Sequence, residues 1–174
     1  MKKIKHLFFD LDRTLWDFEK NSYEELISIY NKNQLHQKGI SLKDEFIKVY
    51  KQINEECWVL YRENRMSKEK LRSERFKRTL LYYGINDDEL AQKMGNQYIE
   101  NSPKRTILVD GTIELLEYLK ESYQMHIITN GFEEVQFDKL KNSGLFEYFD
   151  QIITSEAVGF KKPHSAIFEY ALNK

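Results

Sequence analysis

The chain reads Phe8-Phe9-Asp10-Leu11-Asp12-Arg13-Thr14-Leu15 near its start, at the end of an apolar segment that begins at Ile4. A nearly continuous apolar run is typical of a strand that is buried on both faces, as in a parallel sheet. Two carboxylates therefore follow a buried strand, with one residue between them. Packing gives little reason to place two like charges there, whereas metal-assisted transfer chemistry uses such a pair as nucleophile and proton carrier.

The chain then changes from a strand period to a helical period. Apolar residues recur at helical spacing in four successive segments, and no low-complexity linker separates them. Ser22 and Glu25 have the spacing of a capping box for the first helix, and Ser67 is expected to cap the third. The sequence thus predicts an all-helical insert at residues 17–102.

Strands and helices alternate again after Pro103. Strands are expected at residues 125–129 and 151–154, and helices at residues 112–122, 133–142 and 165–174. This alternation predicts an α/β fold, a doubly wound parallel sheet formed by residues 1–16 and 103–174. Ligands of such sheets bind at the carboxyl ends of the strands, so Asp10, Thr129 and the loop after Thr154 are expected to converge.

Two later segments carry residue types that suit a phosphate. A predicted strand ends in Thr129-Asn130-Gly131, where backbone N–H groups can cradle an anion. Residues 155–163 end in Lys162-Pro163, and the proline favours an extended backbone that gives the lysine side chain a fixed direction. Alone, the first segment would be a simple turn and the second a solvated charge pair. Their order after the two carboxylates points to one shared site.

Together, the three segments resemble the haloacid dehalogenase-like (HAD) hydrolase superfamily. The resemblance rests on Asp10-Leu11-Asp12-Arg13-Thr14, on Thr129 and on Lys162-Pro163, and the helical insert resembles the cap domain of that family. Within the superfamily, the chain resembles the pyrimidine 5′-nucleotidase subgroup. The residues that carry this narrower resemblance are residues 128–132 and 155–159 and, in the insert, Trp58, Tyr61, Asn64, Leu71, Arg75 and Phe76.

The resemblance implies catalytic roles for four residues. Asp10 would be the nucleophile that forms an aspartyl-phosphate, and Asp12 would be the general acid and base. Thr129 would hydrogen-bond the transferring phosphoryl group. Lys162 would neutralise negative charge on the nucleophile and the phosphate, as a phosphate dianion approaching a carboxylate requires.

The resemblance also implies substrate contacts and a cofactor. Thr14, Asn130 and Gly131 are the expected substrate-binding residues. Mg²⁺ is the expected cofactor, held by the Asp10 carboxylate and the Asp12 backbone carbonyl. Family members that displace halide carry an aromatic residue where Asp12 stands and need no metal, so Asp12 favours a phosphatase.

The sequence therefore predicts a Mg²⁺-dependent phosphatase of small phosphomonoesters, with nucleoside 5′-monophosphates as expected substrates. Two alternatives stay open: a sugar phosphatase or phosphosugar mutase on the same core, and a fragment that only binds phosphate.

Bulk properties limit the partners. A formal net charge of −1 attracts neither a nucleic acid polymer nor an acidic membrane. Asp10 interrupts the first apolar segment too early for a membrane span. A single cysteine, Cys57, fits a reducing compartment. We expect a cytoplasmic protein, a monomer or weak homo-oligomer, whose partner is a small phosphorylated metabolite.

Two features depart from the family pattern. Position 13 is commonly glycine or a small or acidic residue in this family; here it is Arg13, for which we expect a modest effect on activity. The family's fourth motif, an acidic pair on a later strand, is not found before Lys174. That motif completes the Mg²⁺ shell, and its strand pairs with the strand that bears Asp10. We therefore expect that the natural protein is longer or that this chain is a truncated product, and that residues 5–11 form an exposed edge without that strand.

Overall fold

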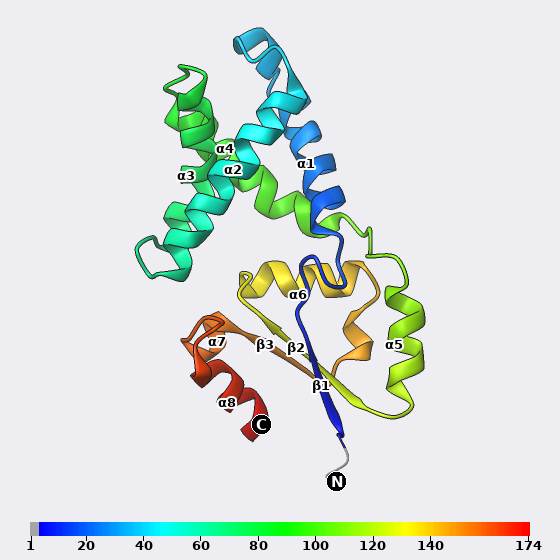
Figure 1. Ribbon diagram of the computed structural model, residues 1–174. Helices are drawn as coiled ribbons and strands as arrows, with labels where there is room; N and C mark the ends of the chain where they lie inside the picture. The colour runs from blue at the N-terminus through cyan, green and yellow to red at the C-terminus, as the bar shows by residue number, and fades with distance from the viewer. Residues whose placement is uncertain (1–3) are drawn as a thin grey trace. The chain divides into compact units, whose positions relative to one another are not determined.

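The computed structural model describes residues 4–174 (Figure 1). Its helices and strands follow the order β1 (His6–Phe9), α1 (Phe18–Lys32), η1 (Leu35–Lys38), α2 (Lys43–Arg62), α3 (Lys68–Tyr82), α4 (Asp88–Asn101), η2 (Ser102–Lys104), α5 (Thr112–Lys120), β2 (Gln124–Thr129), α6 (Glu133–Asn142), η3 (Phe146–Tyr148), β3 (Gln151–Thr154), α7 (Ser155–Val158) and α8 (Ser165–Asn173). Within the described residues, no helix has both the length and the apolar character needed to cross a membrane.

The chain divides into two compact units. The core unit consists of Met1–Asn21 and Pro103–Lys174, and the helical unit consists of Ser22–Ser102. The division follows Asn21 because its side chain is tied to the core unit: Nδ2 donates to the carbonyl of Ile107 at 2.7 Å, and Oδ1 accepts from the N–H of Ile107 at 3.1 Å. The predicted extent of a functional cap, residues 17–102, stays a prediction.

A three-stranded parallel sheet, in the order β1-β2-β3, forms the centre of the core unit. In its register, Phe9 pairs with Ile127 and Thr129 pairs with Thr154. The carboxyl ends of the three strands therefore lie at the same end of the sheet, where Asp10 follows β1. The predicted α/β fold with a parallel sheet is confirmed.

Helices cover both faces of this sheet (Figure 1). On one face, Ile127 of β2 packs with Leu116 of α5 and Leu140 of α6. On the other face, Ile128 packs with Ile167 of α8. Successive residues of one strand thus enter two apolar layers, which makes the sheet doubly wound, as predicted.

Strand β1 forms one edge of the sheet within the described residues. Residues 7–9 are only half buried and His6 is exposed, whereas β2 is buried from Met125 to Thr129. The apolar sequence of β1 predicts burial on both faces, but without a further strand residues 5–11 are expected to form an exposed edge. Leu11 is buried, whereas the exposed edge is found for residues 5–10. The reason is that β2 pairs with only one side of β1.

A histidine pair joins β1 and β2 near their amino ends. The ring of His126 stacks on that of His6 at a centroid distance of 5.3 Å, and Nε2 of His126 lies 3.1 Å from Nδ1 of His6. Burial lowers the pKa of His126 below its ordinary value of 6.5; the charge of Asp150 opposes this shift, and His6 adds to it.

The lowered pKa of His126 predicts that the core unit loses stability in acid. Between the lowered pKa of His126 and 6.5, the unfolded chain binds more protons than the folded chain, so the free energy of unfolding should rise with pH across that window. His126→Gln should flatten this slope, as measured by urea unfolding from about pH 5 to pH 8. The control is His36→Gln, which changes an exposed histidine and should leave the slope at its wild-type value. An unchanged slope in His126→Gln would contradict the prediction.

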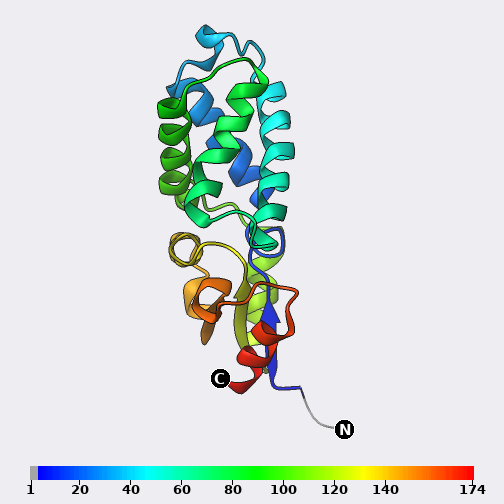
Figure 2. The same ribbon diagram turned by 90° about the vertical axis from the view of Figure 1, so that its left-hand side faces the viewer.

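The helical unit has a core of its own, formed by α1, α2, α3 and α4 (Figure 2). Its fully buried side chains include Leu26, Tyr50, Phe76 and Met94, one from each helix. The insert is therefore helical, as predicted.

The starts of two helices test the capping predictions. Ser67 caps α3 as predicted, because its side chain accepts a hydrogen bond from an N–H in the first turn of that helix. The predicted capping box of Ser22 and Glu25 is wrong, since both residues are buried inside α1. The start of α1 is held instead by Asp17, whose Oδ1 accepts from the N–H of Lys20 at 3.0 Å.

Candidate active site

The four predicted catalytic residues lie at or after the carboxyl ends of the strands. Asp10 directly follows β1, and Asp12 lies two residues further on, where it forms an isolated β-bridge with Trp16. Thr129 is the last residue of β2, and Lys162 lies between α7 and α8. All four belong to the core unit.

An ion pair holds Asp10 in place. Nζ of Lys162 lies 2.8 Å from Oδ1 of Asp10 and donates to the carbonyl of Ile128 at 2.7 Å. The N–H of Leu11 donates to the same Oδ1 at 2.9 Å. The Asp10 side chain is 47% exposed. The carboxylate is therefore fixed in orientation and reachable by a ligand.

The backbone of Lys162 is held by the side chain of Asn130. Nδ2 of Asn130 donates to the Lys162 carbonyl at 3.0 Å, and its Oδ1 accepts from the Lys162 N–H at 2.7 Å. These two hydrogen bonds connect the end of β2 with the loop that carries the lysine. The side chain of Asn130 thus positions Lys162, and a substrate contact by Asn130 stays a prediction.

A second set of contacts surrounds Asp12. Nζ of Lys139 lies 2.5 Å from its Oδ1, and Nε2 of Gln136 donates to its Oδ2 at 3.0 Å. The same Nε2 donates to Oγ1 of Thr129 at 2.8 Å. The amide of Gln136 therefore bridges Asp12 and Thr129.

Gln136 and Lys139 are not among the predicted site residues. Both are buried on α6, with exposed fractions of 1% and 5%, and they alternate with the buried Val135 and Leu140. Two polar residues, three positions apart within the buried stripe of a helix, are the signal that could have identified them. Buried polar groups need hydrogen-bond partners, and here the partners are site residues.

Two of the predicted substrate contacts have other partners in this structure. Thr14 is exposed, and its N–H donates to the carbonyl of Leu11 at 3.3 Å. The N–H of Gly131 donates to Oγ1 of Thr129 at 3.1 Å. Substrate binding by Thr14 and Gly131 stays a prediction.

Arg13 occupies a backbone position that favours glycine. Its φ of 65° lies in the left-handed region, which costs a residue with a side chain roughly 1–2 kcal/mol. The side chain stays close to the start of α1: Nε pairs with Glu19 at 3.0 Å, and the guanidinium lies 4.5 Å from the centroid of the Phe18 ring.

Arg13→Gly should therefore have a small net effect. Relief of backbone strain is offset by loss of an exposed ion pair, worth about 0–1 kcal/mol, and of a cation–π contact of about 0.5–1 kcal/mol. We expect a change in unfolding free energy within about 1 kcal/mol and a kcat/KM within roughly threefold of wild type. Urea unfolding and steady-state kinetics would measure both, and a large loss of activity would contradict the modest role assigned to Arg13.

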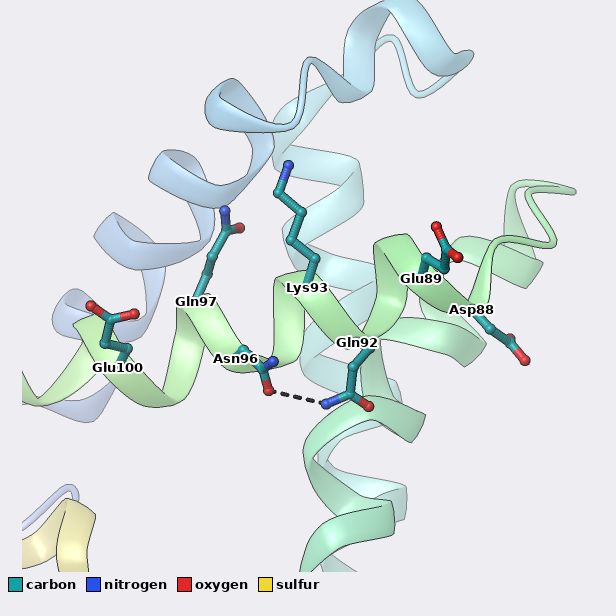
Figure 3. A pocket seen from close by; sticks show the side chains of 7 residues that line it. All are labelled: Asp88, Glu89, Gln92, Lys93, Asn96, Gln97 and Glu100. Carbon is teal, nitrogen blue, oxygen red and sulfur yellow. Dashed lines mark hydrogen bonds between the residues drawn. The ribbon is translucent and has the colours of Figure 1, made fainter.

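Two features of the helical unit do not form a comparable site. Figure 3 shows a hollow along α4 that is lined by seven residues. Three of them carry a negative charge (Asp88, Glu89 and Glu100), and one, Lys93, carries a positive charge. This lining would repel a phosphate. Cys57 is buried, and burial raises the pKa of its thiol, which disfavours the nucleophilic thiolate.

Comparison with known sequences agrees with this geometry. A family model described as haloacid dehalogenase-like hydrolase matches residues 4–174. The HAD-hydrolase YfnB of Bacillus subtilis (strain 168) is 30% identical over 175 residues, which cover 100% of this chain and 71% of YfnB. The pyrimidine 5′-nucleotidase YjjG of Escherichia coli (strain K12) is 28% identical over 169 residues, 97% of this chain and 70% of YjjG.

Comparison with solved structures gives the same fold. The crystal structure of YfnB bound to magnesium has a TM-score of 0.89 at 29% identity, covering 99% of this chain and 74% of YfnB. An L-2-haloacid dehalogenase from Xanthobacter autotrophicus has a TM-score of 0.70 at 20% identity, covering 98% of this chain and 64% of the dehalogenase, which shows a shared fold. The chain is a hydrolase and belongs to the haloacid dehalogenase-like family.

Proposed function

We propose that this hydrolase is a Mg²⁺-dependent phosphatase that cleaves small phosphomonoesters through an aspartyl-phosphate on Asp10. The observation that carries the proposal is the 2.8 Å ion pair of Asp10 with Lys162 at the carboxyl end of β1, beside a second carboxylate at Asp12. A hydroxyl at Thr129 completes a set of groups suited to phosphoryl transfer.

In the first half-reaction, a carboxylate oxygen of Asp10 attacks the phosphorus. Both contacts that orient Asp10 use Oδ1, so we assign the attack to Oδ2. A bond forms between Asp10 and phosphorus, and the bond from phosphorus to the ester oxygen breaks. Asp12 gives its proton to that oxygen, so the substrate leaves as an alcohol.

In the second half-reaction, water attacks the phosphorus of the aspartyl-phosphate. Asp12 takes a proton from the water, the bond between Asp10 and phosphorus breaks, and inorganic phosphate leaves. Throughout, the ammonium of Lys162 offsets negative charge, and the hydroxyl of Thr129 donates to a phosphoryl oxygen. Each residue returns to its starting state.

The residues present fit Mg²⁺. This ion prefers oxygen ligands, and in protein sites it is often held by one or two carboxylates, substrate phosphate and water. Within residues 4–174, no group of three or more His, Cys, Asp or Glu side chains could hold a metal. The half-exposed Asp10 carboxylate and the Asp12 backbone carbonyl would supply the protein ligands. When bound, Mg²⁺ supplies positive charge to the nucleophile and the phosphoryl group.

Nucleoside 5′-monophosphates are the substrates we propose. The support is the similarity to YjjG, a pyrimidine 5′-nucleotidase, over 97% of this chain and 70% of YjjG. Substrate choice would depend on residues 17–102 acting as a cap domain. We also propose a cytoplasmic location, with which the buried, free thiol of Cys57 is compatible.

A phosphate-release assay tests these proposals. Pyrimidine and purine nucleoside 5′-monophosphates and sugar phosphates are compared, with Mg²⁺ and after removal of metal by EDTA. We expect release from nucleotides that stops with EDTA and returns with added Mg²⁺. A preference for sugar phosphates would contradict the substrate assignment. Isomerisation without release would indicate a mutase, and phosphate binding without turnover would contradict the enzyme itself.

A further inference from the structure

The amide of Gln136 makes two hydrogen bonds to two different site residues. An amide nitrogen carries two hydrogens. In Gln136, Nε2 donates to Oδ2 of Asp12 at 3.0 Å and to Oγ1 of Thr129 at 2.8 Å. Because Gln136 is fully buried on α6, water does not compete for these bonds.

These contacts determine what the hydroxyl of Thr129 can do. A hydroxyl has two acceptor lone pairs and one hydrogen to donate. Oγ1 of Thr129 accepts from Nε2 of Gln136 and from the N–H of Gly131 at 3.1 Å, so both lone pairs are used. The hydroxyl hydrogen is left to donate outward, which suits a phosphoryl oxygen, since that oxygen can only accept.

Gly131 provides the space that Gln136 occupies. A Cβ atom built at position 131 would lie 2.4 Å from Cδ and 2.7 Å from Nε2 of Gln136. Any side chain at this position would therefore displace the amide from Asp12 and Thr129. Gly131 thus contributes room for Gln136 in addition to its N–H.

Lys139 fixes the other oxygen of Asp12. Its side chain is only 6% exposed, Nζ lies 2.5 Å from Oδ1 of Asp12, and the ammonium is 4.2 Å from the centroid of the Trp16 ring. A buried ammonium between a carboxylate and an aromatic face has little freedom to move. With Gln136 on Oδ2, both oxygens of Asp12 are held, and the plane of the carboxyl group is set.

We propose that Lys139 and Gln136 are positioning residues for the phosphatase reaction. Lys139 orients the carboxyl group of Asp12 toward the leaving oxygen, and Gln136 holds Asp12 while it sets the hydroxyl of Thr129 as a donor. The inference rests on the proposed function, because it assigns these contacts to that reaction.

A comparison of two substrates tests Lys139. An aliphatic phosphate ester such as uridine 5′-monophosphate needs a proton on its leaving oxygen, whereas p-nitrophenolate leaves without one. The ratio kcat/KM reports the steps up to the first phosphoryl transfer. We expect Lys139→Met to lower kcat/KM about 10²-fold on the nucleotide and less than about tenfold on p-nitrophenyl phosphate.

The control for Lys139→Met is Lys141→Met, which changes an exposed lysine on the same helix. It should leave kcat/KM at the wild-type value on both the nucleotide and p-nitrophenyl phosphate. Equal losses on the two substrates, or no loss, would overturn the assignment of Lys139, because a merely structural defect would lower both reactions alike. Should Lys139→Met fail to fold, Lys139→Gln takes its place in the same comparison.

A transition-state mimic tests Gln136. Inorganic vanadate resembles the transferring phosphoryl group and should depend on the donor at Thr129. We expect Gln136→Met to weaken vanadate inhibition about 10- to 100-fold and to lower kcat/KM on both substrates. Gly131→Ala should act in the same direction, because it displaces the same amide. Unchanged vanadate inhibition in Gln136→Met would overturn its role.

The wild-type chain separates this inference from the proposed function. No turnover of either substrate by wild type would overturn both. An active wild type with equal losses in Lys139→Met and unchanged vanadate inhibition in Gln136→Met would overturn this inference alone.

Discussion

Asp10→Asn should abolish phosphate release while leaving the fold intact. An amide cannot attack phosphorus to form the acyl phosphate, so we expect turnover below about one part in 10⁴ of wild type. Asp10 is half exposed at the end of β1, and asparagine has nearly the same shape, so the thermal unfolding midpoint should change little. Phosphate release and a thermal melt measure the two effects.

A trapping experiment makes this test specific for the nucleophile. When the wild-type chain is quenched in acid during turnover, intact-mass analysis should show an added phosphoryl group, and peptide mapping should place it on Asp10. Asp10→Asn should lack this adduct. Asp110→Asn, which changes an exposed carboxylate elsewhere in the core unit, should keep both adduct and activity. Retained hydrolysis in Asp10→Asn would refute the proposed mechanism.

Lys162→Met should lower kcat/KM by about 10²- to 10³-fold. The substitution removes the ammonium 2.8 Å from Asp10, so a phosphate dianion would approach a carboxylate without that cation. The backbone at this position should stay in place, because the side chain of Asn130 holds the N–H and carbonyl of residue 162, which methionine retains. Steady-state kinetics with a nucleoside 5′-monophosphate measures the loss.

Inhibition by inorganic phosphate gives a second readout for Lys162. Loss of the cation should weaken this inhibition together with kcat/KM, and Lys162→Arg should recover part of both. Lys120→Met serves as the control, since Lys120 is exposed and its ion pair with Glu117 lies on the surface of α5. A loss smaller than tenfold in Lys162→Met would contradict the assigned role.

Most of the core unit could be predicted because its segments have simple patterns. Residues 133–142 and 151–154 form α6 and β3 with the predicted bounds, since Gly144 marks the end of one element and a short apolar run marks the other. The predicted capping box at the start of α1 was wrong, because Ser22 and Glu25 fit that motif by their spacing alone. Spacing does not reveal that Asp17 caps the helix earlier and that both residues are buried.

The approach of Asp10 and Lys162 could also be predicted. Parallel strands bring their carboxyl ends together, so Asp10 after β1 and the loop after Thr154, which carries Lys162, are expected at the same end of the sheet without any knowledge of side-chain packing. The roles of Gln136 and Lys139 depend on which face of α6 meets the turn after β1, and a sequence alone does not give that orientation. For the same reason, the hydrogen bonds from the side chain of Asn130 to Lys162 became visible only with the structure.

Hydrogen bonds within the core unit join the two segments between which the helical unit is inserted. The N–H of Asp17 donates to the carbonyl of Ile107 at 3.0 Å, Asn21 binds the same residue through both of its amide atoms, and the indole of Trp16 donates to the carbonyl of Arg105 at 3.0 Å. The segments that precede and follow Ser22–Ser102 are thus joined to each other within the core unit. Chimaeras joined after Asn21 and before Pro103 would keep these hydrogen bonds and exchange the helical unit alone, which would test whether that unit determines the proposed substrate range.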